Sequence, residues 1–227
     1  MPLEVIKKIK DFLARNPYIN LYFSDTHVHV KISLIFGIFS SLFYAVFNMV
    51  AGIIYSSFWL ILVFVYYALV LSVRYAMLRA QGKEFRDRER CRTALLCGIV
   101  YLLLFVTVSG MIAYTLIERR VPEYKIAVII VLSCYAGYTL SSAAMAIMRS
   151  HYDKQILHRV AYTARFVTAL MSAFNLFVAL LPYFEFADTL SVALVSVAGI
   201  FTALIVLYLA LTIIINSTAA LRKQMSE

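Results

Sequence analysis

The chain has 227 residues, of which 63% are hydrophobic and only 15% charged, and its net charge is +9. Soluble domains carry about 25% charged residues, so too little polar surface is present to cover a globule in water, which excludes a soluble protein. The basic balance predicts membrane topology, because lysine and arginine collect in the cytoplasmic loops of membrane proteins. We therefore expect no nucleic acid among its partners.

Residues 3–15 predict an amphipathic helix. At about 100° per residue, its apolar side chains fall on one face, and its charged side chains, including Lys7, Lys8 and Lys10, fall on the other. This pattern is typical of a helix in the membrane interface, with its cations near anionic lipid headgroups on the cytoplasmic side. The alternative is a helix packed on the cytoplasmic ends of the spans. We take residues 1–30 as this helix and an entry segment, and residues 31–227 as the transmembrane domain.

The entry segment contains a candidate metal-binding set. In an extended strand, Asp25, His27 and His29 would point the same way, and such a set can bind a transition metal. In a helix, residues two apart diverge and the site is lost. The other interpretation is a polar entry into the first span, with Ser24 or Asp25 as its N-cap. We favour the polar entry and expect neither a bound metal nor a cofactor.

Apolar stretches fill most of the chain, and none of them contains an aspartate or a glutamate. A transmembrane helix needs about 20 predominantly apolar residues. The sequence therefore predicts an all-α, polytopic membrane protein with six transmembrane helices. They are placed near Ser33–Tyr55, Trp59–Met77, Ala94–Ile117, Ala127–Met148, Phe166–Phe184 and Leu190–Ile215.

The basic residues lie almost entirely in alternate loops, and Arg119, Arg120 and Lys125 are the only ones in the remaining loops. Because positive residues of short loops stay in the cytoplasm, we expect three in–out–in hairpins with both termini cytoplasmic. One cytoplasmic loop contains the charged run 83–90, which we interpret as a solvated helix extension. The alternative is a docking surface for anionic lipid or for a protein partner.

Polar residues inside the spans indicate a candidate cavity, because such groups normally face protein or water rather than lipid. If the second and third hairpins are internal repeats, Tyr135 superposes on Tyr208, and Thr139 on Thr212; repeat interfaces hold the sites of many transporters. Arg74 either snorkels to the inner interface or forms the cavity floor, as a ligand for an anion or a lipid headgroup. The alternative is that these groups serve packing alone. The candidate lining residues are Asn48, Tyr67, Arg74, Tyr135, Thr139, Asn175, Tyr208 and Thr212.

The fourth span is expected to be the central, most buried one. Ser133, Gly137 and Ser141 form a small-residue stripe at i, i+4 and i+8, a spacing that allows helices to approach closely. In contrast, Phe58 and Trp59 begin the second span, where we expect them in the aromatic belt of the outer interface.

Four short aromatic runs recur through the first, second and fourth spans: Phe43–Asn48, Gly52–Trp59, Tyr66–Arg74 and Tyr135–Leu140. With these runs the chain resembles an uncharacterised family of small six-span membrane proteins of Gram-positive bacteria. The resemblance implies a location in the bacterial plasma membrane, and it implies no activity.

The spans contain no histidine or carboxylate that could act as an acid or base, and we expect no enzyme. The first functional hypothesis is a small-solute binding or transport component. The alternative is a non-catalytic scaffold or regulatory subunit that holds a partner through its basic cytoplasmic loops. A hydrated central cavity would favour the first hypothesis, and a dry, packed bundle would favour the second.

Overall fold

The structure, a computed structural model, describes residues 26–80, 87–122, 124–150, 156–184 and 187–226. Its elements are α3 (Thr26–Ile54), α4 (Phe58–Ala80), α5 (Asp87–Glu118), α6 (Ile126–Ser150), α7 (Ile156–Leu180), the short 3₁₀ helix η1 (Leu181–Phe184) and α8 (Asp188–Ser226). All six α-helices are long and apolar enough to cross a membrane. This confirms the all-α prediction with six candidate spans. The amphipathic helix predicted over residues 3–15 lies outside the described residues.

The first helix begins earlier than the apolar stretch itself. α3 is already helical at Thr26, so the backbone at His27 and His29 is helical. Residues two apart on a helix differ by about 200° around its axis. The extended strand that the metal hypothesis requires is therefore not formed. Asp25, the third member of that set, lies outside the described residues.

The hairpin between α3 and α4 is closed by backbone hydrogen bonds. The N–H of Ser57 donates to the carbonyl of Gly52 (2.9 Å), and Ser56 adopts a positive φ of 49°. This is a Schellman-type helix end with serine in the left-handed position. Gly52 also permits close approach, because an added Cβ would lie 3.3 Å from the backbone nitrogen of Ile61.

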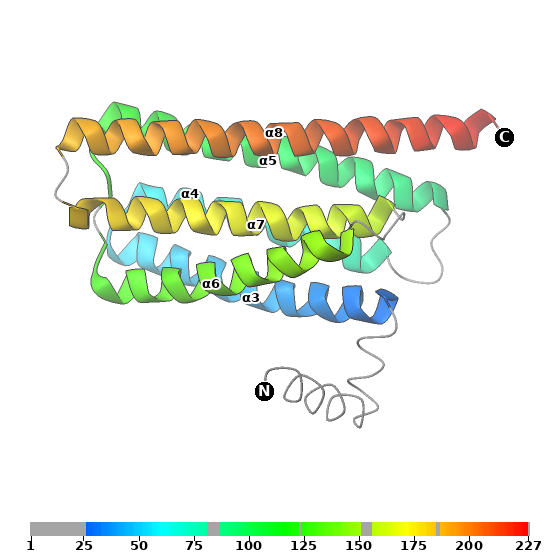
Figure 1. Cartoon of the computed structure of the whole chain (residues 1–227), viewed down its shortest axis with the longest axis horizontal. Helices are drawn as coiled ribbons and strands as arrows, with labels where there is room; N and C mark the ends of the chain where they lie inside the picture. Colours follow the sequence, from blue (N-terminus) through cyan, green and yellow to red (C-terminus); the bar gives the residue numbers. More distant parts are fainter. Residues whose placement is uncertain (1–25, 81–86, 123, 151–155, 185–186, 227) are drawn as a thin grey trace, which may run out of the picture.

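The bundle has three layers of two helices: α5 with α8, α4 with α7, and α3 with α6 (Figure 1). Among the described residues, packing is most extensive between α5 and α8, between α3 and α4, and between α6 and α7. Of the three expected hairpins, only the first therefore has two helices that pack mainly on each other. The helices of the second and third hairpins pack across hairpins instead, α5 on α8 and α6 on α7.

Glycines on both helices allow α5 and α8 to pack closely. A Cβ added at Gly98 of α5 would lie 2.6 Å from Cγ1 of Ile214, and one added at Gly199 of α8 would lie 2.6 Å from Cγ1 of Ile112. Transmembrane helices gain little from apolar contact as such, because lipid is equally apolar. Close packing at small residues is therefore what holds this pair together.

The most buried span is α7 and not α6. In α7, 67% of the most apolar window is buried inside the protein, against 28% in α6, the lowest value of the six spans. The prediction that span four is central is therefore wrong. Ser133, Gly137 and Ser141 are all exposed, and the Ser141 hydroxyl donates to the Gly137 carbonyl at 2.8 Å. A hydroxyl satisfied by its own helix can face lipid, so the stripe does not require a neighbouring helix.

Candidate functional site: a buried polar seam and its arginine pocket

Buried polar and aromatic side chains line the boundary between the α3–α4 pair and the α6–α7 pair. We call this set the polar seam. Its members are Ser41, Tyr44, Trp59, Tyr67, Arg74, Tyr135, Thr139, Thr168, Ser172 and Asn175.

At one end of the seam, Asn175 connects three helices. Trp59 Nε1 donates to Asn175 Oδ1 at 3.1 Å, and Asn175 Nδ2 donates to the Tyr44 hydroxyl at 3.0 Å. All three side chains are buried. An amide in an apolar interior needs such partners, because a buried polar group without one destabilises the fold. Trp59 therefore lies in the core. The prediction that it belongs to an aromatic belt at the membrane interface is wrong.

A cluster of three tyrosines occupies the middle of the seam. Tyr44 stacks on Tyr135 with ring centroids 3.9 Å apart and an interplanar angle of 6°. Tyr67 meets both rings edge-on, at 4.6 Å from Tyr44 and 5.5 Å from Tyr135. The hydroxyls of Tyr135 and Ser41 are 3.4 Å apart. Aromatic pairs of this kind contribute about 0.5–1.5 kcal/mol beyond their buried area, so the cluster holds α3, α4 and α6 together.

Two polar atoms in and beside the tyrosine cluster are unsatisfied. The Tyr67 hydroxyl and Oδ1 of Asn48 are buried and have no hydrogen-bond partner among the described residues. The other end of the Asn48 amide is satisfied, because Nδ2 donates to the Tyr44 carbonyl one turn earlier at 2.7 Å. Each unsatisfied buried group costs about 1–3 kcal/mol.

Arg74 lies inside the bundle and not at its surface. Its side chain is only 5% exposed. Arg74 lies six residues before Ala80, the last residue of α4, which places its Cα about 9 Å from that end of the helix at 1.5 Å per residue. Its guanidinium donates to the Gly37 carbonyl of α3 and, at 2.9 Å, to the Thr168 hydroxyl of α7. Gly37 is required for this position, because an added Cβ would lie 3.1 Å from Cζ of Arg74.

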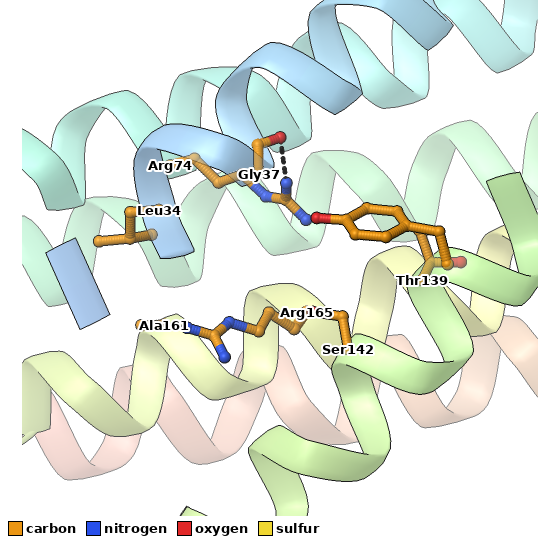
Figure 2. A pocket seen from close by; sticks show the side chains of 8 residues that line it. Leu34, Gly37, Arg74, Thr139, Ser142, Ala161 and Arg165 are labelled. Atoms are coloured by element: carbon orange, nitrogen blue, oxygen red, sulfur yellow. Dashed lines mark hydrogen bonds between the residues drawn. The ribbon is translucent and has the colours of Figure 1, made fainter. Parts of the chain in front are cut away.

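A second buried arginine borders the same space. The sequence placed Arg165 just outside the fifth span, whereas α7 continues past it and the side chain is 7% exposed. Arg165 and Arg74 both line a small pocket together with Gly37, Thr139 and Ser142 (Figure 2). The volume that the centre of a water molecule can occupy there is only ≈ 10 Å³. A cavity of this size holds about one water.

No acidic residue occurs in α3, α4, α6 or α7, the helices that line this pocket. Two arginine side chains, Arg74 and Arg165, thus border the same small pocket. The Arg165 guanidinium stands over the Tyr162 ring at 5.7 Å, a cation–π contact. On the α6 side, the Thr139 and Ser172 hydroxyls are 2.5 Å apart. The pocket is lined by two arginines and by hydroxyl groups, and the Thr139 hydroxyl among them is hydrogen-bonded to its own helix and to Ser172.

Two of the predicted lining residues lie elsewhere. Tyr208 of α8 is 69% exposed, and Thr212 donates its hydroxyl to the Tyr208 carbonyl at 2.8 Å. α8 packs against α5 on a different face, which includes Val206 and Ala210. Tyr135 points inward where Tyr208 points outward, so the proposed repeat does not place equivalent residues in equivalent surroundings.

Sequence reasoning missed several members of the site. Tyr44, Thr168 and Arg165 were not among the expected lining residues. For Arg165 a signal existed: Val160, Ala161 and Ala164 continue the apolar pattern of the span toward the N-terminus, and all three are buried. That periodicity would have extended the span past Arg165.

Comparisons of the chain with family models, with curated protein sequences and with solved structures gave no match.

Proposed function

We propose that this protein is a binding or transport component for a small solute, located in a bacterial plasma membrane with both termini cytoplasmic. The observation that supports this function best is the polar seam with two unsatisfied atoms, the Tyr67 hydroxyl within it and Oδ1 of Asn48, which is hydrogen-bonded to Tyr44 of the seam. A solute that carries its own hydrogen-bonding groups would satisfy them. Polar groups retained inside a membrane protein without partners are a recognised mark of a functional site.

The packing of the helices suggests how the seam opens. α3 packs on α4 and α6 on α7, so each pair can move as a unit, and the seam lies between the two units. Rocking of one helix unit against another is a common way to expose a site alternately on either side of a membrane. Opening requires hydrogen bonds between α4 and α7 to break, among them Trp59–Asn175, Arg74–Thr168 and the bond from the Tyr66 hydroxyl to the Val167 carbonyl.

Cysteine accessibility tests this mechanism. With Cys91, Cys97 and Cys134 replaced by alanine, Ser41→Cys and Ser172→Cys place single thiols in the seam. A membrane-impermeant thiol reagent is then applied to right-side-out and to inverted vesicles. We expect labelling of the seam thiols from at least one side, and from both sides in a transporter.

The matched control is Thr115→Cys. Thr115 is fully buried on α5 but lies outside the seam, so its thiol should stay unlabelled in both kinds of vesicle. A seam that resists the reagent as completely as Thr115 does would contradict the proposal.

The second candidate is a non-catalytic scaffold or regulatory subunit that holds a protein partner through its basic loops. The observation in its favour is the small size of the arginine pocket, which has room for about one water. Under this hypothesis the seam never opens, and the labelling experiment distinguishes the two functions. In either case we propose contact between residues 3–15 and anionic lipid headgroups, and no catalytic role.

A further inference from the structure

We infer that the Tyr124 side chain is the external gate of the polar seam. The inference rests on the proposed function and its topology, and it names how access to the same site is controlled. Tyr124 lies two residues before α6 and outside the six candidate spans, yet it is only 6% exposed. A tyrosine next to the membrane surface usually keeps its hydroxyl in the polar interface. Tyr124 instead belongs to the buried core of the bundle.

Tyr124 lies at the end of the bundle where α3 and α7 end and α6 begins (Figure 1). Part of the seam is close to the same end, because Asn48 and Asn175 lie six and five residues before the ends of α3 and α7. Burial raises the pKa of the Tyr124 hydroxyl well above its usual value, and the nearby Tyr44 hydroxyl raises it further. The phenol is therefore neutral, and it lies near a member of the seam.

A hydrogen bond close to the surface holds the backbone of Tyr124. The Tyr183 hydroxyl of η1 donates to the Tyr124 carbonyl at 3.0 Å, and Tyr183 is 52% exposed. Water can replace such a bond at little cost. The next residue, Lys125, holds its ammonium group 5.3 Å from the centre of the Tyr55 ring. Tyr55 follows α3 and Tyr183 follows α7, so these contacts attach the backbone around Tyr124 to both helix pairs.

These contacts allow the ring of Tyr124 to move while the helices stay in place. When the bond from Tyr183 breaks, Tyr124 can turn away from Tyr44 and leave a path from the external side toward Asn48. Residues next to the ends of helices are common hinges, because they absorb changes in backbone angles without loss of helical hydrogen bonds. The ring in its buried position therefore closes the seam on this side.

Thiol labelling near the gate tests the inference. All three native cysteines are replaced by alanine, and Asn48→Cys then places a single thiol one turn from Tyr44. A dilute membrane-impermeant reagent is applied to right-side-out and to inverted vesicles. At low reagent concentration the ring returns to its closed position faster than the thiol reacts, so the labelling rate follows the population of the open form.

Two variants should raise the labelling rate in right-side-out vesicles alone. Tyr124→Ala removes the ring and should raise the rate at least about tenfold, because the closed position loses the packing of a buried aromatic side chain. Tyr183→Phe removes only the bond to the Tyr124 carbonyl and should raise the rate about two- to tenfold, the equivalent of one hydrogen bond. Tyr124→Phe retains the ring, so it should restore the slow labelling of the parent.

The matched control is Tyr208→Ala, which removes the same ring from an exposed position of α8. Its labelling rate should equal that of the parent in both kinds of vesicle. The sidedness of the effect separates a gate from a general loosening of the bundle, because loosening would raise labelling from both sides.

The inference would be overturned if Tyr124→Ala and Tyr183→Phe labelled at the parent rate, or if they raised labelling equally from both sides. It would equally fail if Tyr124→Phe labelled as fast as Tyr124→Ala. This failure is separable from that of the proposed function. Reactive thiols at Ser41 and Ser172, with no effect of the Tyr124 variants, would leave a transport component with a different entrance. Labelling at Asn48→Cys that Tyr124 controls, with unreactive thiols at Ser41 and Ser172, would leave a gated recess in a static bundle.

Discussion

Gly199→Leu should destabilise the protein by separating α8 from the rest of the bundle. A Cβ added at Gly199 would lie 2.6 Å from Cγ1 of Ile112 on α5 and 3.3 Å from Cζ of Phe174 on α7. Both neighbours are buried, so neither has free space into which it can move. The further carbons of leucine enlarge the overlap. Overpacking of this kind typically costs about 1–3 kcal/mol.

The expected cost translates into a measurable change in thermal stability. For chains of 150–250 residues, 1 kcal/mol corresponds to about 2–4 °C in Tm. Gly199→Leu should therefore lower the Tm by roughly 2–12 °C. The assay is the loss of helical circular dichroism on heating the purified protein in detergent. Gly199→Ala introduces the Cβ alone and should fall between the parent and the leucine variant.

The matched control is Gly137→Leu on the exposed face of α6, where an added Cβ meets nothing within 4 Å. Its Tm should equal or exceed that of the parent, because glycine is about 0.8–1 kcal/mol less favourable than alanine within a helix. If Gly137→Leu proved as destabilising as Gly199→Leu, α6 would be packed where the structure shows it exposed, and the reasoning would fail.

Three further predictions concern the seam, the topology and the N-terminal segment. Trp59→Phe removes the donor to Asn175 Oδ1 and should cost about 1–3 kcal/mol; an unchanged Tm would contradict a stabilising role for this bond. A reporter fused at Arg120 should read as external, and a cytoplasmic signal there would reverse the predicted orientation. In residues 3–15, a spin label at Ile9 should be shielded from water and one at Lys10 exposed, whereas equal accessibility would exclude an amphipathic helix.

The sequence alone determined the number and approximate limits of the spans. The first span was expected to end at Tyr55 and the second to begin at Trp59, and in the structure α3 ends at Ile54 and α4 begins at Phe58. This agreement has a simple cause, since the thickness of the hydrocarbon core sets how many consecutive apolar residues a span needs. Arg74 is the one charged residue inside the six expected spans, and all other charges lie outside them. Asn48, Tyr67, Arg74 and Asn175 could likewise be singled out, because polar groups at membrane depth are expensive to expose to lipid.

Only the tertiary structure decided which helices pair and which side chains meet. Tyr135 is buried, whereas Tyr208 is 69% exposed, although both occur in similar apolar sequence. In water, the hydrophobic effect would mark the inward face of each helix. In a bilayer, lipid tails are as apolar as a protein core, so the contrast between inside and outside disappears from the pattern. Large apolar side chains such as Phe43, 72% exposed, accordingly face outward. The pairing of α5 with α8, the central place of α7 and the convergence of Arg74 with Arg165 follow from close packing at particular residues, which hydropathy does not record.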